Sequence, residues 1–272
     1  MGAESGRLVI VDFSEVISTE VIYRFETPIM TDSLGRRCWD FPKIVEEVVS
    51  ALKEAAPRGP FESMAVDTWG LDFGLLDEQS NLISNPVSHR DHRTDGYLRK
   101  ADEMVGVERL HFETGAQLLE INSIFQLMAI QDQSPEELVA ARHLLMMPDL
   151  ILFALTGEIG MEYTIASTTG LYDTQGNEWA IGLARDLKIP THILGDVVDA
   201  GTFRGTLSEE IQVKTGTGPL RCYATSSHDT AAAVVATPLS SPGSAYISSG
   251  TWSLMGVEID APIINEVTLR ER

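Results

Sequence analysis

The stretch SAYISSGTWSLMGVEI at positions 244–259 reads as a strand, a polar turn and a second strand, with Gly250 and Thr251 at the tip. Apolar runs on both sides of such a turn are typical of a β-hairpin. A similar pattern opens the chain, where the polar turn GAESGR at positions 2–7 leads into the apolar run LVIVDF. Glycine-bounded polar turns let backbone N–H groups approach a phosphate closely. Two such hairpins at opposite ends of the chain suggest an internal duplication.

The composition sets limits on the fold and on the partners. A chain of 272 residues, of which 43% are hydrophobic, can bury one large core or two ordinary ones. The formal charge of −20 argues against nucleic acid and anionic membranes as partners, because both would be repelled. The simplest reading of this charge is solubility.

The cysteines and the apolar runs indicate the compartment. Cys38 and Cys222 lie far apart and form no metal-binding spacing, which suits a reducing cytoplasm better than an oxidised scaffold. No apolar run approaches the ~20 residues that span a bilayer, and no basic-then-apolar leader opens the chain. We therefore expect a cytoplasmic protein with no membrane partner.

Strand-like and helix-like patterns alternate along the chain. The sequence predicts an α/β domain with a mixed sheet over residues 1–240, followed over residues 241–272 by the protruding hairpin that opens a second domain. Asp40 is the expected N-cap of one helix, and Ser134 with Glu137 is the expected capping box of another. The strand-like runs are 8–13, 16–25, 63–69, 73–77 and 221–225, and the helix-like runs include 95–147, 178–189 and 228–236.

The motif SSHDTAAAV at positions 226–234 places an aspartate, Asp229, between a strand and a run of small residues. Ligands of open α/β sheets bind at such strand ends, although Asp229 could equally be an ordinary helix N-cap. A hydrolase triad is excluded for Ser227, His228 and Asp229, because adjacent residues cannot align as nucleophile, base and orienter.

The motif VDTWGLDFGLLD at positions 66–77 carries Trp69, Gly70 and Asp72 in a polar break between apolar runs. A tryptophan, a glycine and an acid together can stack on a sugar ring and hydrogen-bond it. The equally plausible alternative is a tight hairpin with a packed tryptophan.

Two other patterns are set aside. The triplets DFG at positions 72–74 and HRD at positions 89–91 occur in the reverse of the protein-kinase order, and Gly96 stands where that family has asparagine. His89 and His92 could ligate a metal, but without further ligands they fit a polar surface or a substrate loop better.

The assembled motifs resemble those of rhamnulokinases, a branch of the FGGY carbohydrate kinases, in the same order and over nearly the whole chain. Those kinases have the actin-like (ribonuclease H-like) ATPase fold of actin, hexokinase and Hsp70. The motifs that carry the resemblance are GAESGR, Trp39-Asp40, VDTWGLDFGLLD, PVSHRDHRT, INSIFQLMA, LLMMPDLILFALTGE, EYTIASTTGLYD, SSHDTAAAV and AYISSGTWSLMG.

The resemblance implies a reaction, namely ATP-dependent phosphorylation of a ketose. The expected sugar is L-rhamnulose, converted to L-rhamnulose 1-phosphate in L-rhamnose catabolism, with ATP and Mg²⁺ as cofactors. Asp229 would be the general base that takes the proton from the attacking sugar hydroxyl. The sugar-binding residues would be Trp69, Gly70, Asp72, His228, Asp229 and Thr230. The residues that line the ATP phosphates would be Ala3, Glu4, Ser5, Gly6, Arg7 and Thr251.

The resemblance also implies missing parts. In the family, a strand with a magnesium-binding aspartate precedes the opening turn, and an adenine pocket follows the second hairpin. We expect both to be absent here and assign no metal ligand within the chain. The expected consequences are a gap or exposed edge in the sheet, self-association through that edge, and no useful kinase activity of this chain alone.

Two further functions stay open at this point. The chain could be a catalytically inactive sugar-binding remnant of a carbohydrate kinase. It could also belong to another actin-fold protein, such as an ATPase or a sugar-sensing regulator. The absence of a DNA-binding segment speaks against a regulator, and the HDT sequence at positions 228–230 favours a catalytic ancestry over an ATPase.

Overall fold

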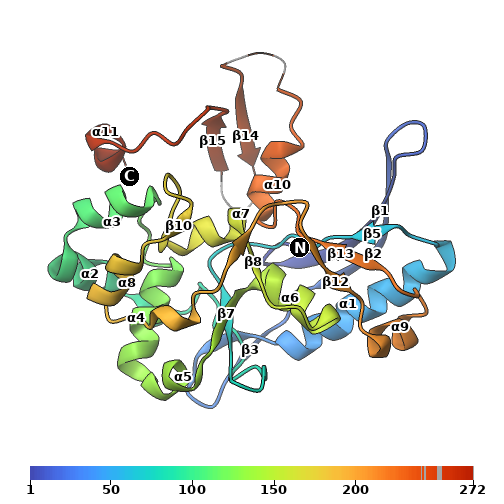
Figure 1. Ribbon diagram of the computed structural model, residues 1–272, viewed down its shortest axis with the longest axis horizontal. Helices are drawn as coiled ribbons and strands as arrows, with labels where there is room; N and C mark the ends of the chain where they lie inside the picture. Colours follow the sequence, from blue (N-terminus) through green and yellow to red (C-terminus); the bar gives the residue numbers. More distant parts are fainter. Residues whose placement is uncertain (240, 242, 250–252, 272) are drawn as a thin grey trace.

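Two hairpins project from a mixed α/β body in the computed structural model, which describes residues 1–239, 241, 243–249 and 253–271 (Figure 1). The first hairpin joins β1 (Ser5–Asp12) to β2 (Ser18–Glu26) in antiparallel pairing. The second joins β14 (Ala245–Ser249) to β15 (Ser253–Val257), also antiparallel. The second hairpin confirms the strand–turn–strand prediction for residues 244–259. The first joins two runs predicted as strands, but its turn lies at residues 13–17, which contain no glycine, and the predicted glycine turn at residues 2–7 only leads into β1. The tip of the second hairpin, with Thr251, lies outside the described residues.

Helix α1 (Phe41–Ala55) begins where the sequence predicts. The Asp40 side chain caps it by accepting a hydrogen bond from the Lys43 backbone N–H at 3.1 Å. Its apolar side buries Ile44, Val48 and Leu52 against the body. The short hairpin of β3 (Ile29–Thr31) and β4 (Arg37–Trp39) precedes the helix.

The central sheet is mixed, as predicted, but it is divided. Strand β13 (Arg221–Tyr223) pairs antiparallel with β12 (Phe203–Thr206) and parallel with β5 (Ser63–Met64). The expected strand 63–69 is therefore wrong in length, because β5 pairs with one neighbour only and ends after two residues. A groove of about 1080 Å³ separates β5 from β1, and both strands line it. That a strand is missing beside β1 stays a prediction.

Two hydrophobic clusters lie on opposite sides of a buried strand pair, β6 (Phe73–Leu76) and β7 (His143–Met146). Leu144 and Met146 belong to one cluster and Leu145 to the other, as the alternation of side chains along a strand requires. The expectation of helix throughout residues 95–147 is wrong for β7. Its short apolar run cannot be told from a buried helical turn by periodicity.

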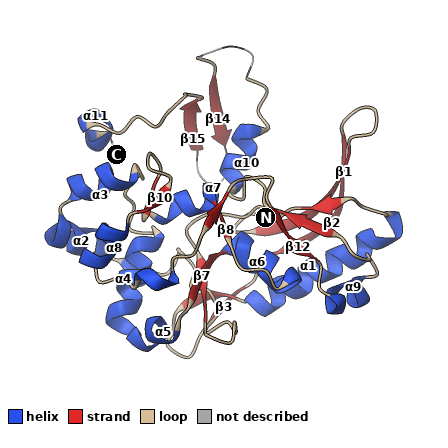
Figure 2. Ribbon diagram, in the orientation of Figure 1, coloured by secondary structure: helices blue, strands red, loops and turns tan. Residues whose placement is uncertain are grey.

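Helices cover the body on both sides (Figure 2). The cluster with Leu144 and Met146 lies under α2 (Tyr97–Val105), α4 (Ser123–Gln133) and α8 (Ile181–Asp186). The remaining helices are α3 (Val107–Thr114), α5 (Pro135–Ala140), α6 (Met147–Thr156), α7 (Tyr163–Ala166), α9 (Glu209–Thr215), α10 (Asp229–Val235) and α11 (Glu266–Arg270). The 3₁₀ turns are η1 (Ala56–Arg58), η2 (His92–Thr94), η3 (Ser167–Thr169) and η4 (Thr191–Ile193). The remaining strands are β8 (Met161–Glu162), β9 (Tyr172–Asp173), β10 (Glu178–Trp179) and β11 (Val197–Val198).

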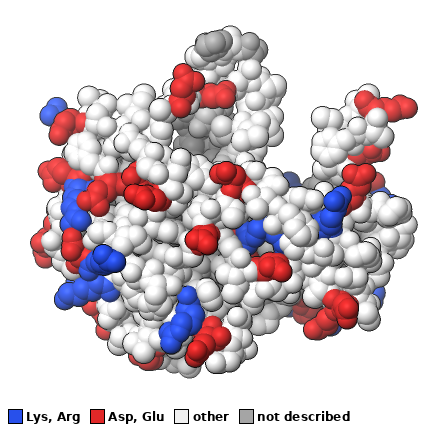
Figure 3. All heavy atoms as spheres, in the orientation of Figure 1, with Lys and Arg blue, Asp and Glu red and all other residues white. Residues whose placement is uncertain are grey.

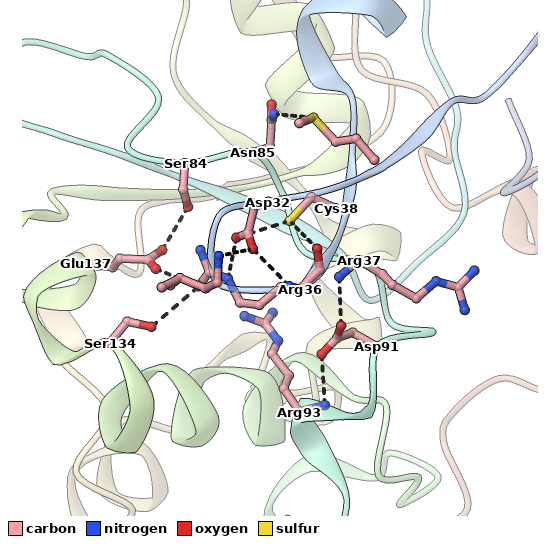
Figure 4. Close-up of polar contacts among 12 residues, drawn as sticks. Asp32, Arg36, Arg37, Cys38, Ser84, Asn85, Asp91, Arg93, Ser134 and Glu137 are labelled. Carbon is pink, nitrogen blue, oxygen red and sulfur yellow. Dashed lines mark hydrogen bonds and ion pairs between the residues drawn. The ribbon is translucent and has the colours of Figure 1, made fainter.

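The predicted capping box of α5 does not form. Ser134 is the N-cap residue, but its side chain makes no capping hydrogen bond. Glu137 instead accepts from Arg36 Nη1 at 2.7 Å and from the Ser84 hydroxyl at 2.8 Å (Figure 4). Arg36 also donates to Asp32 at 2.7 Å, so this cluster ties the β3–β4 hairpin to α5. The ion pair between Arg36 and Glu137 thus takes the place of the capping box expected at the start of α5.

The remaining global features agree with the composition. Cys38 and Cys222 are both buried free thiols. Lysine and arginine side chains lie in small groups among acidic and uncharged ones on the face in Figure 3, so the described residues there form no continuous basic surface. In the described part of the chain, every helix is too short or too polar to cross a membrane.

Candidate active site

The carboxyl end of β13 and the segment after β5 meet in a backbone junction. The Thr68 N–H donates to the Ser227 carbonyl at 2.9 Å, and the Asp229 N–H donates to the Thr68 carbonyl at 2.8 Å. Thr68 and His228 form a parallel β-bridge. The Trp69-Gly70 and His228-Asp229 motifs, which the sequence predicts to converge, therefore lie side by side at one end of the sheet.

Asp229 opens α10 with its side chain accessible from solvent, at 37% exposure. His228 Nε2 lies 3.6 Å from Asp229 Oδ1, and the Thr230 hydroxyl donates to the same oxygen at 3.3 Å. Burial lowers the pKa of His228, and the charges of Asp229, Glu162 and Asp67 oppose that shift. The imidazole is therefore predominantly neutral at pH 7, which leaves the Asp229 carboxylate free to accept a proton.

The turn at Gly70 is held against Thr168. A Cβ at position 70 would lie 3.0 to 3.2 Å from three side-chain atoms of Thr168, which is why a glycine stands there. Leu71 follows with a φ of 78°, and its N–H donates to the Thr168 hydroxyl at 3.2 Å. Its carbonyl accepts from the Ser123 hydroxyl at 2.6 Å and from Gln126 Nε2 at 3.2 Å. The turn is fixed on both sides.

Trp69 and Asp72 are part of the core. Trp69 is 5% exposed and its ring centroid lies 4.4 Å from that of Trp39, so the indole offers no open face for stacking. Asp72 is 0% exposed, and its Oδ2 accepts from the indole N–H groups of Trp39 and Trp69 at 2.7 and 2.9 Å. The expectation that both side chains contact a sugar directly is wrong for this structure. The packed-tryptophan alternative describes Trp69 correctly.

The histidines of the HRDHR loop differ in their surroundings. His89 Nδ1 lies 2.8 Å from Asp72 Oδ2 with an 11% exposed side chain, so the core carboxylate orients it. His92 is 88% exposed and lies 3.4 Å from Asp95. Within the part of the chain that the structure describes, no three His, Cys, Asp or Glu side chains are placed to hold a metal together.

The opening turn lies next to the junction. The terminal ammonium of Met1 donates to the Asp67 carbonyl at 2.6 Å, and the Gly2 N–H donates to the Ser5 carbonyl at 2.9 Å. Gly6 has a packing role as well, because a Cβ there would overlap the Phe25 ring. Among the other predicted phosphate-facing residues, Ala3 packs on the core, Glu4 pairs loosely with Arg90 at 3.7 Å, and Arg7 lines the groove.

The site has members that the sequence reasoning assigned no role. Glu162, Thr164 and Thr168 contact the junction or the Gly70 turn, and the charge of Asp67 acts on the pKa of His228. The signal available in the sequence was the run of hydroxyl residues in EYTIASTTG at positions 162–170. A run of this kind does not tell which hydroxyls point toward a distant segment.

Comparison with known proteins identifies the class. The model of the FGGY family of carbohydrate kinases, N-terminal domain, matches residues 1–236. The chain therefore belongs to the FGGY family of carbohydrate kinases. Its relatives include a rhamnulokinase of Mannheimia succiniciproducens, 34% identical over 99% of this chain and 55% of that protein. A rhamnulokinase of Pectobacterium atrosepticum is 37% identical over 96% of this chain and 52% of that protein.

Solved structures agree on the fold. A carbohydrate kinase from Novosphingobium aromaticivorans superposes with a TM-score of 0.79 at 18% identity, covering 99% of this chain and 57% of that one. Plasmodium falciparum glycerol kinase with ADP gives a TM-score of 0.78 at 14% identity, covering 93% and 52%. The predicted actin-like class is thereby confirmed. The chain spans about half the length of the relatives it matches.

Proposed function

We propose that this chain supplies the sugar-binding and proton-accepting half of an ATP-dependent sugar kinase. The proposed reaction converts L-rhamnulose to L-rhamnulose 1-phosphate in L-rhamnose catabolism. The observation that carries the proposal is the junction between Thr68 and Asp229, which sets an accessible carboxylate beside the Gly70 turn. The curated rhamnulokinases that match nearly the whole chain support the choice of sugar.

Asp229 is the proposed general base. Phosphoryl transfer needs a hydroxyl aligned with the γ-phosphate and a carboxylate that can take its proton. Gly70, His228 and Thr230 are the proposed sugar contacts, since His228 and Thr230 lie against that carboxylate and Gly70 follows the junction residue Thr68 by two positions. Trp69 and Asp72 act on the site through packing, by holding the turn that carries Gly70.

ATP and Mg²⁺ are the proposed cofactors. The opening turn, with Ala3, Glu4, Ser5, Gly6 and Arg7, is the proposed phosphate contact from this half, together with Thr251. Magnesium is commonly held by one or two carboxylates plus substrate phosphates and water. No ligand for the ion is assigned among the described residues, which form no cluster of three or more His, Cys, Asp and Glu side chains that could hold it. When bound, the ion would neutralise charge on the phosphates.

The test measures sugar binding and turnover separately. Calorimetry with L-rhamnulose should give saturable binding that weakens in a Gly70→Ala variant. An ADP-release assay with MgATP should give turnover well below 1 s⁻¹ for this chain, because its described carboxylates form no complete metal site. Asp229→Asn should remove whatever turnover there is while leaving sugar binding within a few-fold.

The possible outcomes separate the function from its alternative. Sugar binding with no turnover, even at high protein concentration, would favour the inactive sugar-binding remnant. A wild-type chain that binds no L-rhamnulose and releases no ADP would overturn the proposal. A rate near 1 s⁻¹ that Asp229→Asn abolishes would support the reaction and contradict the expected weakness of this chain alone.

A further inference from the structure

A short segment from Glu162 to Thr168 contacts both halves of the candidate site. It runs from the end of β8 through α7 into η3. On the side of the Gly70 turn, the Thr168 hydroxyl accepts from the Leu71 N–H at 3.2 Å. The Thr168 side chain also fills the space that a Cβ of residue 70 would need. Thr168 therefore limits how closely the Gly70 turn can approach η3.

Thr164, one helical turn earlier, holds the other half of the site. Its hydroxyl accepts from the His228 N–H at 3.2 Å and donates to Glu162 Oε2 at 2.6 Å. Thr164 lies in α7, and Thr168 lies in the 3₁₀ turn η3 that follows α7 directly. The two threonines thus connect the backbone on either side of the site through one short helical segment.

Glu162 anchors this segment. It is 0% exposed, and its Oε2 accepts from the Ser227 N–H at 3.0 Å and the Ile165 N–H at 3.3 Å in addition to the Thr164 hydroxyl. A glutamate is almost never fully buried unless its charge is paired or hydrogen-bonded, and here three donors converge on Oε2, while Oε1 is buried with no hydrogen-bond partner among the described residues. The carboxylate fixes Ser227 directly and His228 through Thr164.

We propose that Glu162, Thr164 and Thr168 are positioning residues that set the spacing between Gly70 and Asp229. None of the three is assigned a contact with sugar or phosphate. They act through the backbone, by holding residues 71 and 227–228 at a fixed separation. The proposal rests on the proposed function only for its consequence in catalysis, since the contacts themselves are independent of any ligand.

Amide hydrogen exchange on the unliganded 272-residue chain tests the two threonines one at a time. Thr164→Val should speed exchange of the His228 amide about tenfold and leave Leu71 unchanged, because one net hydrogen bond is lost. Thr168→Val should speed exchange of the Leu71 amide and leave His228 unchanged. Thr164→Ser and Thr168→Ser keep the hydroxyl and should restore slow exchange. Changes below about twofold at both amides, in variants that stay folded, would overturn the proposal.

Glu162 is tested by its charge. Glu162→Gln keeps the shape of the side chain but removes the negative charge that favours the His228 imidazolium. The NMR titration midpoint of His228 should therefore fall further below its usual range. Glu158→Gln removes an exposed carboxylate nearby on the same connection and should leave the midpoint unchanged. An unchanged midpoint in folded Glu162→Gln would contradict the role of Glu162. If Glu162→Gln does not fold, the valine variants of Thr164 and Thr168 still test the proposal.

Sugar titration and ADP release separate this inference from the proposed function. One outcome is faster amide exchange in the valine variants while the wild-type chain neither binds L-rhamnulose nor releases ADP. That result would uphold the positioning role and reject the kinase reaction. If ADP release is measurable, the valine variants should lower kcat by about ten- to a hundredfold, and the serine variants should recover it. Unchanged kcat and KM despite faster exchange would overturn the consequence for catalysis.

Discussion

Asp149 and Arg204 form an ion pair at 2.8 Å with 0% and 4% of their side chains exposed. The pair joins α6 to β12, and Arg204 also donates to the Gly160 carbonyl at 2.8 Å, directly before β8. Burial raises the pKa of Asp149 to about 7, because the cost of desolvating the carboxylate exceeds the attraction of Arg204. The charge of Glu162 acts in the same direction as burial.

Stability should fall with rising pH because of Asp149. Its pKa in the folded state, about 7, lies above the usual 3.8 of an aspartate, so the native state binds the proton more tightly than the unfolded one. The stabilising contribution is complete below pH 4 and is lost as the pH rises through 7. Urea unfolding at pH 5 and pH 8 should differ by a few kcal/mol from this group.

Asp149→Asn provides the comparison for that measurement. Because Asp149 is mostly protonated at pH 5, the neutral amide of the variant should change stability little there. At pH 8 the variant should avoid the cost of the ionised, buried carboxylate. The free energy of unfolding of the variant should change less between pH 5 and pH 8 than that of the wild type, because residue 149 no longer titrates while all other groups contribute equally to both proteins. An equal slope would contradict the prediction. A carboxyl ¹³C titration of wild-type Asp149 with a midpoint near 4 would do so independently.

Gly70→Ala should destabilise the fold and weaken sugar binding. Thr168 must move by a few tenths of an ångström to admit the new methyl group, and such overpacking costs about 1–3 kcal/mol. Gly195→Ala is the matched control, because nothing lies within 4 Å of a Cβ at that position. Chemical denaturation gives both values. A loss below about 0.5 kcal/mol at position 70 would show that Thr168 yields freely.

Asp72→Asn should be strongly destabilising although it changes little in size. Oδ2 accepts from two indole N–H groups and lies 2.8 Å from His89 Nδ1, while Oδ1 accepts from Gln126 Nε2 at 3.3 Å. The amide oxygen can replace only one of these two oxygens, so the amide N–H₂ faces donors at the other. The expected loss is about 2–4 kcal/mol in urea unfolding. Asp196→Asn, at an exposed position with no hydrogen bond among the described residues, should change stability by less than about 0.5 kcal/mol.

The free edge of β1 should promote self-association. Among the described strands, β1 pairs only with β2, and Val9 and Val11 beside the groove are 39% and 43% exposed. Light scattering after size exclusion should show mass that rises with concentration. Val11→Lys should shift the chain toward monomer, because a charge on an edge strand opposes pairing.

The control for this prediction changes charge elsewhere. Val213 on α9 is 85% exposed, so Val213→Lys adds the same charge away from the edge and should leave the mass distribution unchanged. A wild-type chain that stays monomeric at high concentration would contradict the idea that β1 offers a usable edge.

Local signals predicted local structure well. The Asp40 cap and the hairpin of β14 and β15 involve residues close in sequence, and each formed where expected. The strand-like runs at residues 8–13 and 16–25 also formed as strands, although they meet in a turn without glycine. The sequence left a stacking and a packed Trp69 equally open, because the packing of Trp69 depends on Trp39 in the β3–β4 hairpin. The bond between Glu162 and Ser227 was equally inaccessible, since no periodicity links two such distant positions. The motifs predicted which segments meet, while packing determined which side chains remain available.

The paired indoles of Trp39 and Trp69 also make the protein optically informative. Two chromophores with centroids 4.4 Å apart and tilted by 46° couple their excited states, which gives a signed pair of bands in circular dichroism. Both indoles share the Asp72 carboxylate with His89, so a disturbance of that loop alters their electronic environment. The site thus carries an intrinsic spectroscopic reporter. Occupancy beside Gly70 could be followed without attaching any dye.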